Sequence, residues 1–534
     1  MDEGKLLSES GGETGKMGEG TTGASNLPPV AWVSASQAAK VMNFAMVFCL
    51  ALMALVITPF FSTVAHYKLY LRESAVGVIF GSWAVGYICC SIALSLTNFS
   101  RLSLRSINLI LRAALIFIGC VMLMFGFLPS MIPPSRSLES EIRLTVAFSA
   151  LRFSFGVACA IFDVSILTFL VACFPHEVSE VVGLWETSAA LGALCGPPIG
   201  GVLYDVGGFS LPFVVTTGVA TVLAVGTAIV QEKSRTLRAL FAQRVAEQRR
   251  REEEEKGKGE KKVAVSFTLK HTKALLLTFP AYQMCGSAVA LWMGVSLFTF
   301  MEALMPIWYD SMYSLSATDV GALIALMAVS FGIVNVVVGK ALDVFPLGRP
   351  YVILLSLFGL GVSAFFLCPS FDLSTAFSFS SSRPSIVLNQ PLHTQTLLTV
   401  AVIAAVGFAV FYSGILVGSQ SLSVDAARRR DPDLVPATGA LMKTMSSLAG
   451  LVGPVAGSEL VQSFGYPRTL FFWGCASLGM GVVFWLMFVC RPPGSEGVFL
   501  KRGERNVQEE EEGEGEGVDE KGKLREEKTS GTGI

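Results

Sequence analysis

Apolar runs of roughly membrane-spanning length, separated by short polar segments, occupy most of this chain. A transmembrane helix needs about 20 mostly apolar residues. Six such runs precede a charged middle segment and six follow it, and they lie near residues 41–63, 75–97, 106–128, 144–173, 182–204 and 211–231, and near 279–308, 318–341, 351–368, 396–424, 437–460 and 468–490. The pattern predicts an all-α membrane protein with 12 transmembrane helices in two six-helix bundles.

The charged residues collect outside these runs. Of the 81 charged residues, 48 lie within residues 1–40, 232–273 and 491–534. We therefore expect five parts: a disordered cytosolic N-tail (1–40), a first bundle (41–231), a charged cytosolic connector (232–278), a second bundle (279–490) and an acidic, disordered cytosolic C-tail (491–534). The rest of the chain is too apolar for a soluble enzyme, and a net charge of −1 gives no footprint for nucleic acid.

The loops and cysteines add orientation and exclude several chemistries. With both termini in the cytosol, cytosolic loops carry 20 Lys and Arg residues against six in the outer loops, although the connector holds most of that excess. The 11 cysteines lie in or at the ends of apolar runs, without a C-x-x-C pair. We expect no metal site, no disulfide framework and no cofactor. Because the sequence has no phosphate-binding G-x-x-x-x-G-K-[ST] motif and no enzymatic constellation, we expect neither a primary pump nor an enzyme.

An internal repeat points to the architecture. The segment from Glu186 to Leu203 and the segment from Lys443 to Leu460 share Thr, Leu, Gly and Pro residues at a constant offset of 257. Two parallel six-span repeats joined by a charged loop are similar to the plan of the major facilitator superfamily. This resemblance implies a substrate site near the bilayer midplane, between two halves that rock against each other.

The resemblance is most specific in spans 5 and 7. The core G-x-x-x-G-P-P-x-G-G resembles the antiporter motif of proton-coupled drug and amine exchangers, and its residues are Gly192, Gly196, Pro197, Pro198, Gly200 and Gly201. Its extension to Phe213 and the segment 300–308 resemble the vesicular amine transporter family, most closely its polyamine-transporting branch. A second superfamily motif, which implies a cytosolic gate between spans 8 and 9, is present with one extra residue as Gly339, Asp343, Gly348 and Arg349.

Five charges inside the spans are candidates for binding substrate and protons, and they are Arg152, Asp163, Glu186, Glu302 and Lys443. A charge at mid-bilayer costs about 2.5–3.5 kcal/mol, so each needs a partner or a task. Arg152 and Asp163 share one helix face as a polar stripe, with Arg152 in proton relay. Glu302 lies beside aromatic residues, which suits a carboxyl that exchanges a proton for a cation. Local structural pairing is the alternative for each of the five residues.

The signs of these charges bear on the substrate. The resemblance implies an acid in spans 1 and 11 of monoamine carriers, but span 1 is neutral here and Lys443 stands in span 11. We therefore expect proton-coupled antiport of a small organic cation, such as a polyamine, seated on Glu302, Glu186 and Asp163. Two alternatives stay open. One is proton-coupled or facilitative transport of an anionic or amphipathic metabolite or drug attracted to Arg152 and Lys443, and the other is a non-transporting receptor or scaffold.

The N-tail carries a sorting signal of low specificity. Asp2, Leu6 and Leu7 fit the acidic dileucine pattern, which sorting adaptors read on cytosolic tails. With the family resemblance, this favours a vacuolar or vesicular membrane, and the plasma membrane stays open. The expected partners are a small-molecule substrate, protons, the lipid bilayer and these adaptors, with no nucleic acid. The superfamily resemblance implies a monomer.

Overall fold

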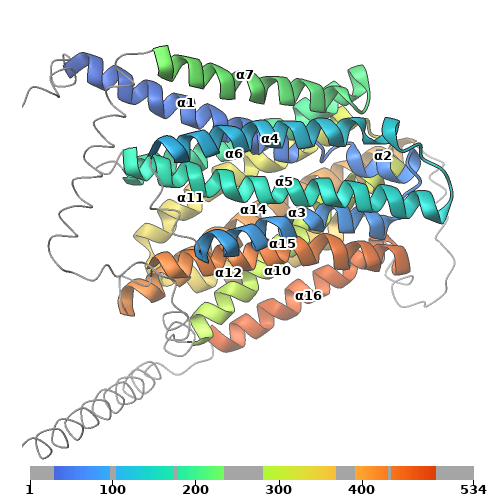
Figure 1. Cartoon of the computed structure of the whole chain (residues 1–534). Coiled ribbons are helices and arrows are strands. Elements are labelled where there is room, and N and C mark those ends of the chain that lie inside the picture. The colour runs from blue at the N-terminus through green and yellow to red at the C-terminus, as the bar shows by residue number, and fades with distance from the viewer. Residues whose placement is uncertain are drawn as a thin grey trace, which may run out of the picture.

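A computed structural model describes residues 29–96, 104–173, 178–233, 281–367, 391–430 and 435–488. The described parts are helical, with short turns between the helices (Figure 1). The helices are α1 (Pro29–Leu55), α2 (Phe61–Tyr67), α3 (Glu73–Leu96), α4 (Leu104–Met131), α5 (Leu138–Cys173), α6 (Val178–Gly207), α7 (Leu211–Lys233), α10 (Ala281–Tyr313), α11 (Ala317–Val344), the short 3₁₀ helix η2 (Pro346–Gly348), α12 (Arg349–Phe366), α14 (Pro391–Arg430), α15 (Val435–Phe464) and α16 (Tyr466–Phe488).

The first helix begins earlier than the apolar pattern predicts. It starts at Pro29, within the segment 1–40 that was predicted as a disordered tail. Proline is favoured at the first position of a helix, and no further proline or glycine interrupts the chain up to Leu55. The helix therefore extends beyond its apolar part and runs across the predicted boundary at residue 40. Nearly all of the connector and the whole C-tail lie outside the described residues.

Ten of the described helices are long and apolar enough to cross a membrane. Two further crossings complete the predicted twelve. In one of them, α1 and α2 together, the apolar helix breaks at residues 56–60, around Pro59. The other is α15, whose apolar character is lowered by Lys443 and Glu459. Proline cannot donate the helical hydrogen bond, so the break in the first crossing follows from the sequence.

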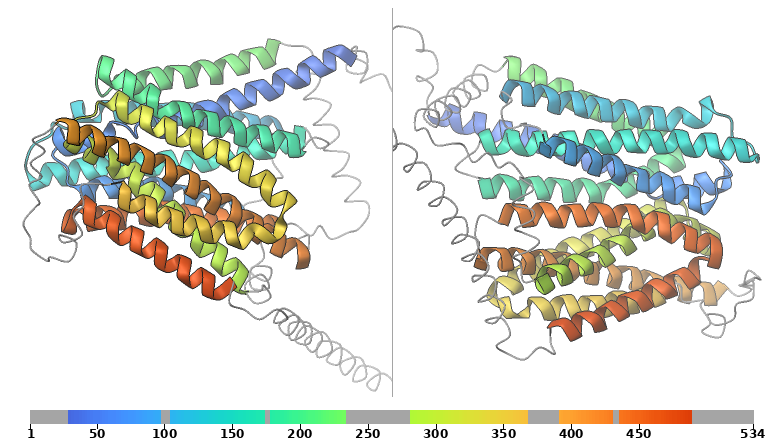
Figure 2. Two further views of the ribbon diagram at one scale, coloured as in Figure 1. Left: turned by 180° about the vertical axis from the view of Figure 1, so that it is seen from behind. Right: turned by 60° about the horizontal axis from the view of Figure 1, so that its bottom comes forward.

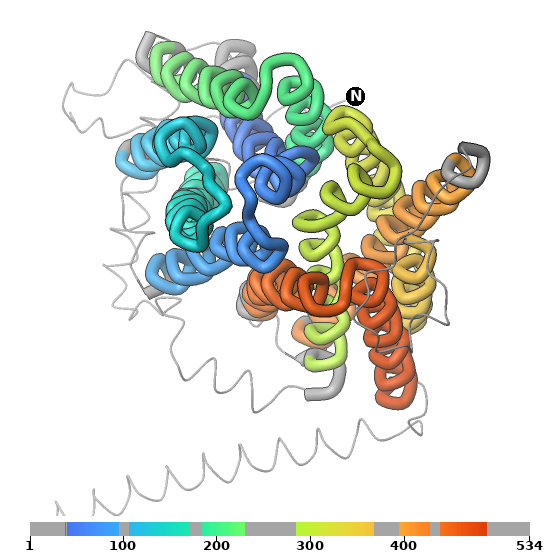
Figure 3. Tube along the Cα trace, turned by 90° about the vertical axis from the view of Figure 1, so that its right-hand side faces the viewer, coloured from blue at the N-terminus to red at the C-terminus, as the bar shows by residue number. Residues whose placement is uncertain are grey.

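The helices form two halves, one from α1 to α7 and the other from α10 to α16 (Figures 2 and 3). Within the first half α1 packs on α6 and α3 on α5, and within the second half α10 packs on α15 and α12 on α14. The halves meet chiefly where α3 contacts α15 and where α6 contacts α11. The predicted two-bundle architecture is confirmed.

Backbone geometry shows that the two halves repeat each other. Gly208 (φ 72°) and Gly465 (φ 83°) are both left-handed, and each follows the fifth crossing of its half at the offset of 257 seen in the sequence. Left-handed glycine is a common helix ending, because it has no Cβ to clash. Tyr70 (φ 57°) and Ser314 (φ 52°) are also left-handed, and they lie 244 residues apart after the first crossing of each half. Two offsets, 257 and 244, therefore relate equivalent positions.

The two ends of the bundle differ in how closely the halves approach. We call the end that carries α2 the α2 end, at the right of Figure 1, and the opposite end, where α1 begins, the terminal end. At the α2 end, a Cβ added to Gly321 of α11 would lie 2.6 Å from the Pro197 carbonyl oxygen of α6. The equivalent Gly77 of α3 lies against the Pro454 carbonyl of α15. Two pseudo-symmetric seams therefore bring the halves together at the α2 end.

Candidate functional site

A hydrogen bond joins the two halves at equivalent positions. The Thr58 hydroxyl donates to Oε1 of Glu302 over 3.2 Å, and the two residues are 244 apart, the offset that relates the first crossings. The glycine packing described below gives the same offset. There α6 contacts the main chain of Leu52, α15 contacts the main chain of Ser296, and these two residues are also 244 apart. Residues that touch their own equivalents must lie at the pseudo-twofold axis. Glu302 therefore occupies the centre of the interface between the halves.

Arg152 of α5 faces this centre with donors to spare. The residue is 4% exposed, and within the described part of the chain Nε and Nη1 have no hydrogen-bond partner. Its guanidinium lies 5.5 Å from the ring centroids of Phe80 and Phe155, and it interacts electrostatically with Glu302 without forming an ion pair. A buried charge without a partner costs about 3–5 kcal/mol, which is the usual cost of breaking a buried ion pair. The guanidinium is thus poised to receive an anionic group or a relayed charge.

Aromatic rings line the second-half side of Glu302. Tyr412 of α14 interacts electrostatically with Glu302. Its ring stacks on Phe298 at 4.9 Å and on Phe331 at 5.4 Å between centroids. The faces of such rings attract cations. Together, Arg152, Glu302 and Tyr412 form what we call the axis cluster, and Thr58 bonds to it from the first half.

A second group of charges lies nearer the terminal end. The Tyr87 hydroxyl of α3 donates to Oδ2 of Asp163 over 3.1 Å. Lys443 of α15 lies 6.0 Å from the Tyr87 ring centroid, and both Lys443 and Glu186 act electrostatically on Asp163. Glu186 and Lys443 are exposed, and neither forms an ion pair with a described residue. We call Tyr87, Asp163, Glu186 and Lys443 the mouth cluster.

The structure thus brings the five predicted charges into two groups rather than one. Arg152 and Asp163 lie 11 residues apart on α5, about 16 Å along a helix axis. Arg152 is grouped with Glu302, whereas Asp163 is grouped with Glu186 and Lys443. Each group has contributions from both halves. The mouth cluster thus lies toward the terminal end, and the axis cluster lies deeper between the halves.

The antiporter motif packs helices against one another. Added Cβ atoms at Gly192, Gly196 and Gly200 would each meet a main-chain carbonyl oxygen of α1, at 2.9 Å for Gly196 and closer for the other two. Gly201 instead approaches the main chain of α11 in the other half. Pro197 and Pro198 form the surface that Gly321 meets. One face of the motif thus holds α1 in place, and the other face builds a seam between the halves.

Only one residue of the gate motif forms an ion pair within the described part of the chain. Nη1 of Arg349, at the start of α12, lies 2.7 Å from Oδ2 of Asp425 on α14, so the pair ties two helices of the second half together. Asp343 is exposed at the end of α11, Gly339 has open space beside it and Gly348 precedes α12. The structure therefore pairs Arg349 with a residue outside the motif.

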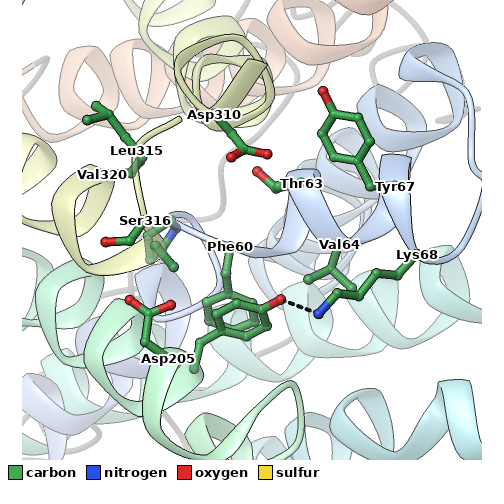
Figure 4. Close-up of a pocket in the computed structure, with 13 residues that line it drawn as sticks. Phe60, Thr63, Val64, Tyr67, Lys68, Asp205, Asp310, Leu315, Ser316 and Val320 are labelled. Carbon is green, nitrogen blue, oxygen red and sulfur yellow. Dashed lines mark hydrogen bonds between the residues drawn. The ribbon is translucent and has the colours of Figure 1, made fainter. Parts of the chain in front are cut away.

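A cavity of about 330 Å³ opens between the halves at the α2 end (Figure 4). On one side of it, Lys68 donates to the Tyr204 hydroxyl over 2.9 Å. Asp205 caps α11 by accepting hydrogen bonds from the main chain and hydroxyl of Thr318, at 2.9 and 2.6 Å. Asp310 faces the cavity from α10. The hydrogen bonds from Thr318 to Asp205 join α11 to α6 and thus strengthen the contact between the halves beyond the glycine seams.

Several residues of these groups were not predicted from the sequence. Thr58, Tyr87 and Tyr412 are uncharged, so the search for charges within the spans passes over them. Asp425 lies near the polar end of α14 and gives no intramembrane signal. Only the offset of 244 singles out Thr58, and the two first crossings share too few residues to reveal that offset in the sequence.

Comparison with known proteins places this architecture in a family. Residues 44–389, well over half of the chain, match the Major Facilitator Superfamily. The chain belongs to this superfamily. It is also similar to the MFS-type transporter SLC18B1 of Homo sapiens, with 26% identity over 189 residues, which are 34% of this chain and 38% of the relative. The SLC18B1 protein of Rattus norvegicus is 26% identical over 159 residues, 30% of this chain and 32% of the relative. The chain thus aligns with about a third of the length of these relatives.

Solved structures support the fold. A point mutant of the nucleoside transporter NupG superposes with a TM-score of 0.58 and 10% identity, covering 84% of this chain and 99% of that one. A bacterial homologue of the human lysosomal transporter Spinster, in an inward-facing and occupied conformation, superposes with a TM-score of 0.58 and 11% identity. The superposition covers 85% of this chain and 96% of that one. The resemblance to the major facilitator superfamily is confirmed. The chain is an integral, multi-pass membrane protein of this superfamily.

Proposed function

We propose that the protein exchanges a small organic cation, such as a polyamine, for protons by alternating access. The observation that carries this proposal is the position of Glu302 at the pseudo-twofold axis, where it accepts a hydrogen bond from the opposite half. A group at the axis can face either end of the bundle as the halves rock. A carboxyl there can hold one proton or one cationic group at a time.

The two charge groups suit successive stages of this exchange. The mouth cluster offers Asp163 and Glu186 to an amine, while Lys443 limits how much positive charge the mouth attracts. The aromatic rings around Tyr412 then form one wall beside Glu302 for the apolar carbons between the amines. Arg152 keeps a positive charge near Glu302, which favours release of its proton when a cation arrives.

A second candidate is favoured by Arg152. Its unpartnered Nε and Nη1 suit a substrate with an acidic group, so an anionic or amphipathic metabolite or drug is the rival substrate class. The two candidates assign opposite roles to the same residues: Glu302 binds substrate in the first, whereas Arg152 and Lys443 bind it in the second. A non-transporting receptor or scaffold would need neither.

The test is uptake into proteoliposomes with an inside-acid pH gradient, using labelled spermidine, a monoamine and an organic anion. We expect gradient-driven spermidine uptake by the wild type and its loss in Glu302→Gln. Glu139→Gln is the matched control, because Glu139 forms an exposed ion pair with Arg143 one helical turn away. Anion uptake that survives Glu302→Gln and fails in Lys443→Ala would overturn the proposal. Absence of flux for every solute would favour the receptor.

For localisation we propose that both termini are cytosolic and that the α2 end faces the lumen of an acidic vacuole or vesicle. The acidic dileucine residues Asp2, Leu6 and Leu7 lie outside the described residues. A fluorescent fusion of the full chain tests this proposal. Vesicular signal that moves to the plasma membrane in the Leu6→Ala, Leu7→Ala variant would support adaptor-read sorting, and an unchanged distribution would contradict it.

A further inference from the structure

Thr58 lies where the first crossing is broken and where the two halves touch. It is 1% exposed, and it sits between α1 and α2, in the turn of residues 56–60. Its hydroxyl donates to Glu302, and one turn further on the Ser62 hydroxyl donates to the main-chain carbonyl of Ala303. Both bonds cross from the first half to adjacent residues of α10. They lie beside the cavity at the α2 end, which Pro59, Phe60 and Thr63 help to line.

We propose that Thr58 is a positioning residue that locks the α2 end shut while Glu302 is ionised and empty, and that releases it when a proton or a cation takes the carboxyl. This inference rests on the proposed function, because it makes Glu302 the exchanging group. It goes beyond that function by naming the contact through which occupancy of Glu302 controls movement of the halves.

The physical basis is the difference between a charged and a neutral acceptor. A hydrogen bond to an ionised carboxylate is about twice as strong as one to a neutral group. A proton on Glu302, or a cation that takes its lone pairs, therefore weakens the bond from Thr58. The Ser62 bond is made to a main-chain carbonyl and does not change with pH, so it gives the lock a constant part.

The other groups around Glu302 leave this role to Thr58. Arg152 of α5 and Tyr412 of α14 are the charged and titratable groups that act on the carboxyl, and both do so without a hydrogen bond to it. Tyr87 and Lys443, on α3 and α15, act on Asp163 instead. Among the described residues, Thr58 is thus the group that bonds Glu302 from the opposite half.

The lock would make exchange obligatory. With an empty, ionised Glu302 the α2 end stays closed, so the carrier does not change conformation without a bound proton or cation. Thr58→Val removes the donor but keeps the shape. We expect the empty carrier of this variant to change state about 10 to 100 times more readily, from the usual strength of a hydrogen bond to a charged group. Downhill spermidine flux should persist while uphill accumulation fails.

The experiment has two arms and three variants. The first arm measures, in proteoliposomes, uphill accumulation of labelled spermidine under an inside-acid gradient and its downhill efflux. The second arm uses no substrate. It measures by pulsed electron spin resonance the distance between labels replacing the exposed Val206 and Gln462 at the α2 end, at pH 5 and pH 7.5, in a cysteine-free background with wild-type uptake. Thr58→Val is compared with Thr58→Ser and with Thr216→Val. Thr216 is a buried threonine that bonds only within α7.

The lock predicts a short label distance at pH 7.5 that lengthens at pH 5 in the wild type, in Thr58→Ser and in Thr216→Val. Thr58→Val should show the long distance at both pH values and at least tenfold lower accumulation, with downhill efflux within twofold of the wild type. Wild-type accumulation and distances in Thr58→Val would overturn the lock. Failure of the wild type to move spermidine would instead count against the proposed function. The label distances, which are measured without substrate, would still show whether Thr58 holds the α2 end closed.

Discussion

Substitution of Gly321 by alanine tests whether the seams at the α2 end set the conformation of the carrier. In the structure, the added methyl carbon would lie 2.6 Å from the Pro197 carbonyl oxygen and 3.0 Å from Cα of Pro198, where ordinary contacts begin at 3.4 Å. The shortfall is about 0.8 Å at the oxygen. Both neighbours are main-chain atoms of α6, so they cannot rotate aside as a side chain would.

The penalty falls on one conformation only. Overpacking of this kind costs about 1–3 kcal/mol, but it applies only while α11 and α6 are in contact. In a state open at the α2 end the seam parts and the methyl group costs nothing. We therefore expect the equilibrium to shift toward the open α2 end by a factor of roughly 5 to 150, since about 1.4 kcal/mol is tenfold. The melting temperature should not fall, because replacing glycine inside a helix gains up to about 1 kcal/mol.

The assay is the distance between labels at Val206 and Gln462, with melting in detergent as the second measurement. Gly332→Ala is the matched control, because Gly332 lies on the same helix with open space beside it. We expect Gly321→Ala to lengthen the distance at pH 7.5 and Gly332→Ala to leave it unchanged. An unchanged distance in Gly321→Ala, or a melting temperature that falls without a change in distance, would refute the reasoning.

Three further predictions follow from the described contacts. Gly196→Ala should force α1 away from α6 by about 0.5 Å, since its methyl carbon would lie 2.9 Å from an α1 carbonyl oxygen, and should lower the melting temperature where Gly332→Ala does not. Tyr87→Phe should keep the ring beside Lys443 but lose the hydrogen bond that stabilises the ionised carboxylate of Asp163. As the pH is lowered, spermidine uptake should therefore fall to half at a higher pH than in the wild type. Arg349→Gln and Asp425→Asn should each destabilise the second half by about 1 kcal/mol, and the double variant by less than the two effects added, as measured by chemical denaturation.

The helices and their grouping are the part of the structure that the sequence predicts best. In a bilayer every main-chain polar group needs an internal partner, so an apolar run of sufficient length has helix as its only stable form. The helix ends are less predictable. The apolar run marks where lipid begins, but α1 continues through Gln37 and Lys40 to Pro29, because nothing in that stretch breaks a helix.

The charges of the site were predictable for the same energetic reason. A residue such as Glu302 or Lys443 stands out because a charge inside a span is costly. Their grouping was not predictable, because it depends on how α5 lies against α10 and α15. The neutral partners Thr58, Tyr87 and Tyr412 carry no such signal, although two of them form the hydrogen bonds that hold the carboxyls in place.

The glycine motif illustrates a second limit. Small residues spaced four apart predict close helix packing, and Gly192, Gly196 and Gly200 do pack on α1. The sequence does not show that Pro197 and Gly201 belong to a different contact, against the other half. Gly321 and Gly77, which complete the two seams, lie outside the antiporter and gate motifs. Their equivalence rests on the offset of 244, which the structure provides.

The axis position explains why the two halves differ where they matter most. A residue on a pseudo-twofold axis faces its own equivalent, so a faithful repeat would place two glutamates in contact. Two carboxylates that close cannot both ionise, and such a pair would hold a proton across much of the working pH range. Thr58 in place of a second acid supplies a donor to an acceptor and leaves one exchangeable site. Under the proposed exchange, the difference between Thr58 and Glu302 turns a symmetric contact into a site for either a proton or a cation, but not both.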